Sequence, residues 1–400
     1  MTRLFSKFNP LELGEICSTS RITKNEVPRA REIIKQVPIY HKNDISLKDA
    51  DGIMEEWHNI LQSGPGVFVV KNLVDDHDVV DRAHSAAEAI IEAEKIKYAN
   101  RGDHFAAGGK NDRIWNYFQK HAVQDPASFA DYYDNPILWV DLSTAENLIC
   151  ESWLGPGYAL TSQHMLIFGY QLNVVLPSRG AAQEPHRDFH LGFQSSEQTT
   201  RFPAVTQMAT QLLTLQGAVA HSDMPLESGP TLLLPFSQKY ESGYIHYRNP
   251  ELIDYFKANA IAIPMSKGDS LFFNPGLHHA AGANVTSGST GIKRSANLLQ
   301  ISSPFGKPME TVDRTTVALS VWNDLSRKYK ETGFTDSLNT LVNVVGQGYS
   351  LPTNLDLDPP PPNGHCPPTQ QEIIRKGLQE GWDYYRAKEE LLKRDEVRRA

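Results

Sequence analysis

Residues 268 to 284 read GDSLFFNPGLHHAAGAN. The segment at 270–273 has the length and composition of a buried strand, and the NPG sequence after it is typical of a turn. The next strand then begins with two adjacent histidines, His278 and His279. Successive side chains of a strand point to opposite faces, so only one of these two imidazoles can be directed at a site between two β layers.

Similar short apolar segments, rich in Val, Leu, Ile, Thr and Phe, recur on both sides of this stretch between turns of Pro, Gly, Ser and Asn. We expect strands at 67–70, 165–175, 206–220, 231–234, 260–264, 270–273 and 296–302. Strands of this length and spacing indicate a double-stranded β-helix, the cupin-like jelly roll. Helices precede and follow the strands, so the predicted fold class is α+β, a jelly roll flanked by N-terminal and C-terminal helices.

Helices are predicted where apolar residues recur three and four positions apart. These segments are 47–61, 75–95, 136–154, 312–329 and an amphipathic stretch at 370–399. Residues 100–135 are polar and aromatic and indicate a loop or lid. We divide the chain into an N-terminal extension (1–45), a jelly-roll domain with supporting helices (46–305) and a C-terminal helical extension (306–400). That last extension carries a proline-rich spacer at 358–368 and is expected to pack on the same domain.

The composition is that of a globular protein. Hydrophobic residues make up 40% of the 400 residues, and a formal net charge of -8 argues against a nucleic-acid partner. No segment has the apolar length of a signal peptide or a membrane helix, and three widely spaced cysteines indicate reduced thiols. We therefore expect a cytoplasmic monomer or homodimer that binds a small molecule, without nucleic-acid or membrane partners.

An HRD tripeptide at 186–188 lies upstream of the paired histidines. A non-haem Fe(II) site needs two neutral imidazoles and one carboxylate on one face of the metal. Residues i and i+2 of a strand share a face, so His186 and Asp188 can supply two of these ligands and a later strand the third. A second such tripeptide, HSD at 221–223, leads into a Pro- and Gly-rich surface turn and is therefore disfavoured.

A cation follows on the next predicted strand, where residues 293–297 read KRSAN. Arg294 can hold the far carboxylate of 2-oxoglutarate by a forked pair of hydrogen bonds. Lys293 is the alternative.

Taken in order, these motifs resemble the phytanoyl-CoA hydroxylase family of Fe(II)/2-oxoglutarate-dependent dioxygenases. They are QEPHRD at 183–188, ESGPTLLLP at 227–235, GDSLFFNPGLHHAAGAN at 268–284 and RSANL at 294–298. The likeness extends over roughly residues 60 to 305.

The resemblance implies a catalytic iron centre and a cosubstrate pocket. The implied metal ligands are His186, Asp188 and His279, the last preferred to His278 because it lies four residues after Pro275. The positions implied to bind 2-oxoglutarate are Arg294, Gln183 and Asn173.

The implied cofactors are Fe(II), the cosubstrate 2-oxoglutarate and O2. In such a reaction 2-oxoglutarate is decarboxylated to succinate and CO2 while a small organic molecule is hydroxylated, desaturated or cyclised, as in secondary metabolism. The carboxylate of Asp188 argues against halogenation, which needs that metal position vacant.

Two features depart from the family. Arg294 follows His279 by 15 residues, a longer interval than is usual, so the intervening turn must be longer. Position 281 is alanine where a Ser or Thr often supports the cosubstrate carboxylate. Two alternative functions are a non-oxygenase metal-dependent cupin enzyme, which leaves Arg294 and Gln183 without a role, and an inactive jelly-roll binding module, which the intact triad disfavours.

Overall fold

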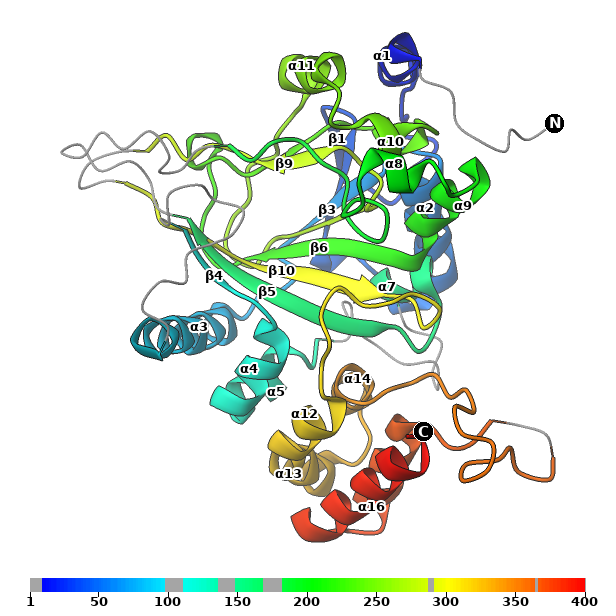
Figure 1. The fold of residues 1–400 in the computed structure, drawn as a ribbon. Coiled ribbons are helices and arrows are strands. Elements are labelled where there is room, and N and C mark those ends of the chain that lie inside the picture. The colour runs from blue at the N-terminus through cyan, green and yellow to red at the C-terminus, as the bar shows by residue number, and fades with distance from the viewer. Residues whose placement is uncertain are drawn as a thin grey trace.

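A computed structural model describes residues 9–97, 111–135, 148–167, 182–286, 291–363 and 366–399. At its centre is an eight-stranded sheet of order β1-β2-β3-β8-β6-β10-β5-β4 (Figure 1). Its strands are β1 (Glu32–Ile34), β2 (Val37–His41), β3 (Val67–Lys71), β4 (Asn111–Ile114), β5 (Ala159–Ile167), β6 (Thr214–Ala220), β8 (Ser270–Phe273) and β10 (Arg294–Ser302). Two more strands, β7 (Thr231–Leu233) and β9 (His279–Ala281), form a small antiparallel sheet.

The small sheet packs over one face of the large sheet. Leu233 of β7 shares a hydrophobic core with Val69 of β3 and with Leu271 and Phe273 of β8. Single antiparallel bridges extend the small sheet on both sides, from Leu233 to residue 261 and from His279 to residue 186. The result is a mixed α/β structure with two β layers, and the predicted double-stranded β-helix stays a prediction.

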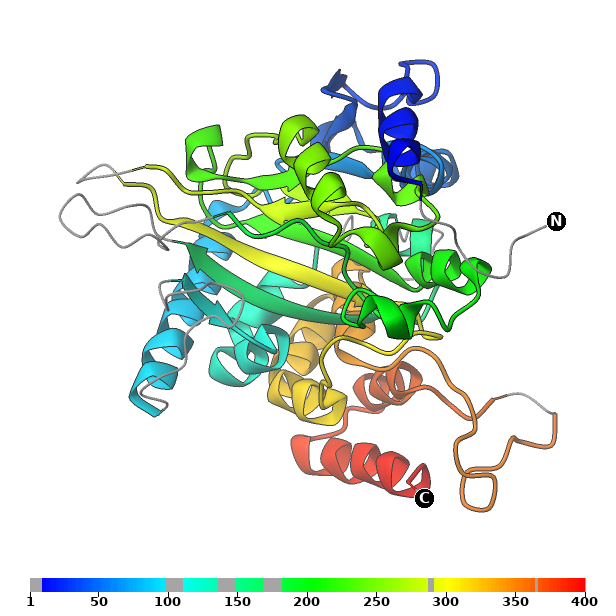
Figure 2. The same ribbon diagram turned by 45° about the horizontal axis from the view of Figure 1, so that its top comes forward.

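Helices cover the opposite face of the large sheet (Figures 1 and 2). The first group is α2 (Ala50–Gln62), α3 (His77–Lys97), α4 (Tyr117–Gln124), α5 (Pro126–Tyr132) and α7 (Ile149–Leu154). The second, near the C-terminus, is α12 (Arg314–Ser320), α13 (Trp322–Thr332), α14 (Asp336–Val345), α15 (Gln370–Gln379) and α16 (Tyr384–Val397). The remaining α-helices are α1 (Pro10–Thr19), α8 (Ser196–Thr199), α9 (Ala204–Ala209), α10 (Gly243–His246) and α11 (Pro250–Asn259).

Because side chains alternate along a strand, the central strands contribute residues to the hydrophobic cores on both faces of the sheet. Phe68 and Phe272 point into the helical core, whereas their neighbours Val67, Val69 and Phe273 point toward the small sheet. Each face of the large sheet can therefore carry a different set of functional side chains.

Several predicted elements were wrong. The expected strand at 260–264 is not formed, and only isolated bridges occur at residues 261 and 265. Of the loop or lid expected at 100–135, residues 111–135 are not a lid, because α4 and α5 pack into the helical core with Tyr132 and Tyr133 fully buried, and residues 100–110 lie outside the described ranges. The expected strand at 206–220 begins only at Thr214, since α9 and a 3-10 turn (Thr210–Leu213) occupy its first half. Its β-branched residues suggested a strand, and short apolar runs of this kind do not distinguish strand from helix. The expected helix at 136–154 is described only as α7, its other residues lying outside the described ranges.

The N-terminal residues join the large sheet, which the sequence did not predict. Strand β2 pairs in parallel with β3, with Ile39 opposite Val69. The C-terminal helices join the helical core, where Trp322 and Ile374 belong to the same cluster as Trp57. The division of the chain into three segments stays a prediction. Among the described residues, no helix combines the length and apolar character needed to cross a membrane.

The C-terminal packing can be tested by truncating one buried side chain. Ile374 is fully buried, so we expect Ile374→Ala to lower the free energy of unfolding of the whole protein by about 2–5 kcal/mol. Leu392→Ala is the control, because Leu392 is 45% exposed and its loss should change stability little. Denaturant unfolding followed by circular dichroism measures both. Equal stability of the two variants would contradict the packing of α15 on this core.

Candidate metal centre

Backbone pairing brings two distant histidines together. The amide of His186 donates to the carbonyl of His279 at 3.0 Å, and the amide of His279 donates back at 3.1 Å. Residues paired directly in this way present their side chains on one face, and the two imidazole ring centroids are 4.4 Å apart.

Asp188 joins them from the same segment. Its amide donates to the carbonyl of Pro275, which continues the pairing past the turn before β9. The Nε2 atoms of His186 and His279 lie 3.6 and 3.4 Å from the two carboxylate oxygens of Asp188. These three side chains form a group whose ligand atoms all lie within 4.8 Å of one another.

The hydrogen bonds of the two rings fix their tautomers. Nδ1 of His186 lies 2.9 Å from the carbonyl oxygen of Glu184, and Nδ1 of His279 lies 2.9 Å from that of Leu277. A carbonyl oxygen can only accept, so each Nδ1 must carry the proton. In the neutral imidazoles both Nε2 lone pairs then point toward Asp188, as a metal requires.

Charges at the site agree with this assignment. Burial lowers the pKa of His186, which keeps its ring neutral near pH 7. Burial alone would raise the pKa of Asp188, but the imidazoles of His186 and His279 in their protonated form, together with a hydrogen bond from Gln216, lower it below its usual range. Nε2 of Gln216 donates to Oδ2 of Asp188 at 2.5 Å. Two neutral imidazoles and one ionised carboxylate are the donor set of a non-haem iron site.

Arg187 and His278, the alternate residues, face away from this site. Arg187 is buried with its guanidinium 5.3 Å from the ring centroid of Tyr244, and a Cβ atom at Gly243 would lie 1.9 Å from its Cζ. A side chain at position 243 would therefore displace this guanidinium. His278 is also buried on the side that faces away from the site, and its Nε2 has no hydrogen-bond partner among the described residues.

The chain turns sharply after Asp188. Phe189 and His190 have φ values of 63° and 37°, in a backbone region that residues other than glycine seldom adopt. The amide of Gly192 closes the turn on the carbonyl of Phe189 at 2.8 Å. This strained turn ends the paired segment immediately after the carboxylate.

The three side chains lie in the wall of a cavity of about 730 Å³. Gln183, one of the predicted cosubstrate residues, lines the same cavity, as do Arg113, Arg248, Gln216 and Thr231. A volume of this size is typical of small-molecule sites.

Arg294 lies in a smaller adjoining cavity. Thr231 and Ala281 line both cavities, so the small one continues from the large one along β7 and β9. Burial lowers the pKa of Arg294 to about 10. No ion pair is found for Arg294 among the described residues, whereas Lys293, the alternative, is exposed. Asn173, the third predicted cosubstrate residue, lies outside the described residues.

Gln216 and Thr231 are among the residues of the cavity wall that the sequence analysis did not predict. Gln216 lies in the middle of β6, where a polar residue in an apolar strand was the available signal. Thr231 is the cross-strand partner of Ala281, and only the register of β7 on β9 reveals that neighbour. The second HxD tripeptide, at 221–223, was expected to lead into a surface turn. Its carboxylate residue, Asp223, is indeed exposed.

Comparison with known proteins gives a family match and distant structural likenesses. The family model "Phytanoyl-CoA dioxygenase (PhyH)" matches residues 64–292. Among curated proteins none matches the chain significantly. The solved structure of the non-heme alpha ketoglutarate dependent carbocyclase SnoK from nogalamycin biosynthesis is 16% identical, with a TM-score of 0.43, over 64% of this chain and 93% of that one.

Two further solved structures are similarly distant. The epimerase SnoN of nogalamycin biosynthesis is 16% identical over 63% of this chain and 84% of its own, with a TM-score of 0.37. AviO1 from Streptomyces viridochromogenes Tue57 is 13% identical over 66% and 99%, with a TM-score of 0.39. The family model spans more than half of the chain and confirms the resemblance drawn from its motifs. The chain belongs to the phytanoyl-CoA dioxygenase (PhyH) family.

Proposed function

We propose that this protein is an Fe(II)/2-oxoglutarate-dependent dioxygenase that oxidises a small organic molecule. The observation that carries the proposal is the convergence of two imidazole Nε2 lone pairs and one carboxylate on the wall of a cavity that continues to a buried arginine. His186, Asp188 and His279 are the proposed metal ligands. The family's double-stranded β-helix is the inferred topology, supported by the two packed β layers.

Bound Fe(II) would supply O2 activation coupled to the oxidative decarboxylation of 2-oxoglutarate to succinate and CO2. The chain's own residues have to hold and orient the reacting groups. Gln216 orients the Asp188 carboxylate by its hydrogen bond, and the carbonyls of Glu184 and Leu277 hold the two imidazoles in the ligand tautomer. Supporting contacts of this kind set both ligand orientation and metal affinity.

The far end of 2-oxoglutarate fits the adjoining cavity. Arg294 there offers a guanidinium fork to a carboxylate, in a region whose other walls are largely apolar. An unpaired buried cation is unfavourable, so a bound carboxylate would stabilise it. A non-oxygenase cupin enzyme would have no use for this arginine.

Thr231 is proposed to replace the hydroxyl that Ala281 lacks. Thr231 and Ala281 are directly opposite in the β7–β9 register, so their side chains share one face. Both line the two cavities. The hydroxyl of Thr231 is therefore proposed to donate to the same cosubstrate carboxylate from the neighbouring strand. Gln183 and, by resemblance alone, Asn173 remain proposed cosubstrate contacts.

The substrate is proposed to occupy the rest of the large cavity. Arg113 and Arg248 line it, the first hydrogen-bonded to Gln163 and the second to the carbonyls of Gly192 and Gln194. These anchored cations favour a small molecule that carries acidic or carbonyl groups. A role in secondary metabolism fits such a substrate.

Loss of a ligand should abolish turnover. We expect His186→Ala and Asp188→Ala to eliminate the Fe(II)- and 2-oxoglutarate-dependent release of succinate, measured by mass spectrometry across a library of metabolites. Asp223→Ala is the matched control, because it alters the competing tripeptide at an exposed position and should leave succinate release unchanged. Succinate release that persists in both ligand variants, or that the unaltered protein never shows, would contradict the proposal.

The hydrogen bond from Gln216 gives a graded test. Gln216→Leu should lower Fe(II) affinity by about 10–100-fold, since the Asp188 carboxylate loses its orienting donor. Gln300→Leu is the control: Gln300 is the cross-strand partner of Gln216 and lines the same cavity, but it does not contact Asp188. Anaerobic Fe(II) titration measures both affinities. Equal losses in the two variants would show that the effect is not specific to Asp188.

The proposed hydroxyl can be tested with substitutions of similar volume. Thr231→Val should raise the KM for 2-oxoglutarate by about tenfold, because one hydrogen bond to a charged group is worth about 1.5 kcal/mol or more. Thr231→Ser keeps the hydroxyl and should keep the KM near that of the unaltered protein. A KM unchanged in Thr231→Val would exclude Thr231 from the cosubstrate site.

A further inference from the structure

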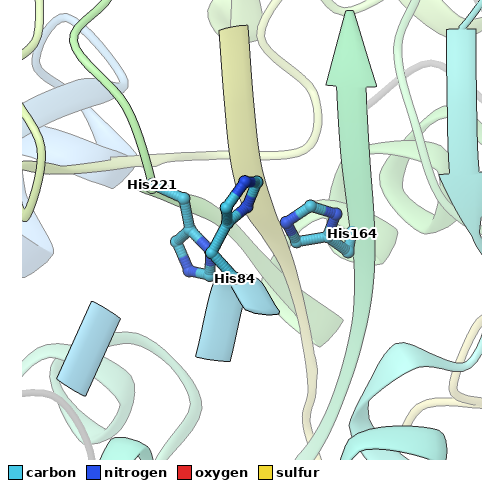
Figure 3. Close-up of side chains that lie close together, drawn as sticks. All are labelled: His84, His164 and His221. Carbon is cyan, nitrogen blue, oxygen red and sulfur yellow. The ribbon is translucent and has the colours of Figure 1, made fainter. Parts of the chain in front are cut away.

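A second group of histidines lies on the helical face of the large sheet. It consists of His84 from α3, His164 from β5 and His221 immediately after β6 (Figure 3). Their ring centroids are 5.3 to 6.2 Å apart, and one nitrogen atom of each ring lies within 4.8 Å of those of the other two. We call this group the trihistidine cluster.

Strand alternation separates the trihistidine cluster from the iron centre. His164 lies between Gln163 and Met165, both of which line the large cavity. Ser295 contacts the cluster, whereas its neighbour Arg294 faces the cosubstrate pocket. The same strands therefore carry the two groups back to back on opposite faces.

The hydrogen bonds of the cluster leave part of it unsatisfied. Oγ of Ser295 lies 3.1 Å from Nδ1 of His84 and 3.0 Å from Nε2 of His164, while the hydroxyl of Tyr132 lies 2.9 Å from Nε2 of His221. Among the described residues, Nδ1 of His164 and Nδ1 of His221 have no partner although both rings are buried. Buried polar atoms without partners are unfavourable, and in native proteins they call for a ligand or a water.

The buried rings are neutral, which is the protonation state that metal binding requires. Burial lowers the pKa of His164 to about 3 and that of His221 well below its ordinary value, so both are neutral with one free lone pair. Lys267, a cation that acts on His221, is paired with Asp81 one turn before His84, and Glu88 one turn after it lies 3.6 Å from Nε2 of His84. These acidic groups on α3 offset part of the charge that a dication would bring.

We propose that His84, His164 and His221 bind a divalent transition-metal ion, with zinc as the favoured metal, at a site separate from the iron centre. Three imidazoles without a carboxylate suit zinc, and a three-histidine set leaves a fourth position for water or another ligand. Zinc–nitrogen bonds of about 2.0–2.1 Å place the ligand nitrogens roughly 3.4 Å apart, so nitrogens that now lie within 4.8 Å of one another have to close in by up to about 1.4 Å.

The site would fasten α3 to the sheet. His84 comes from the helix, whereas His164 and His221 come from the strand layer, so one ion would cross-link two layers. The side chain of His84 is 24% exposed, which gives an ion a route to the cluster from solvent. Binding to the folded state alone raises stability in proportion to the logarithm of the free metal concentration.

The test requires the full chain with the iron centre disabled. In a His186→Ala/His279→Ala background, zinc titrated against a chromogenic chelator should bind at one equivalent and raise the Tm. Adding His84→Ala should weaken binding by more than about 100-fold, because losing even a supporting contact of a ligand costs about 10–100-fold. Adding His77→Ala is the matched control, since His77 is an exposed histidine of the same helix, and zinc binding should persist.

A second measurement guards against a folding defect. His84→Gln keeps a polar side chain at the position, and circular dichroism without metal should show the same helix content as its parent. Cobalt(II) in place of zinc should give visible bands of a nitrogen-ligated ion in the parent and lose them in His84→Gln. Failure of the folded parent to bind zinc or cobalt, or binding that is unchanged in both His84 variants, would overturn the proposal. Neither outcome bears on the iron centre, which is absent from this background.

Discussion

The backbone pair between His186 and His279 is the contact on which the candidate centre depends. Two reciprocal amide–carbonyl hydrogen bonds place residues 93 positions apart in the chain side by side and fix their side chains on one face. A slip of one residue in this register would bring Arg187 or His278 to the site and remove a ligand. The turn after Asp188 and the bond from Asp188 to Pro275 hold the register on one side.

The two faces of the large sheet carry different sets of side chains. One face carries the polar wall of the cavity, where Gln216 meets Asp188. The other carries the helical core and, among its apolar residues, the trihistidine cluster. Because neighbouring residues such as Arg294 and Ser295 point to opposite faces, one strand can contribute to the proposed cosubstrate pocket and to the proposed second metal site without steric conflict.

The two histidine groups differ in the chemistry that they offer. At the candidate iron centre backbone carbonyls fix both tautomers, a carboxylate supplies negative charge, and a cavity lies alongside. In the trihistidine cluster the ligands are imidazoles alone, held by Ser295 and Tyr132, and helices cover them. The first arrangement is suited to turnover with small molecules, and the second to holding an ion in place.

The sequence by itself determined the family, the candidate triad and the longest helices, because these rest on local motifs and on apolar spacing. His186, Asp188 and Arg294 could be named from i, i+2 alternation and from motif order. Only the tertiary structure decided what depends on register between distant strands: Thr231 opposite Ala281, Gln216 against Asp188, and His84 beside His164 and His221. These neighbours are set by pairing and packing between segments far apart in the chain, and no local pattern of residues encodes that proximity.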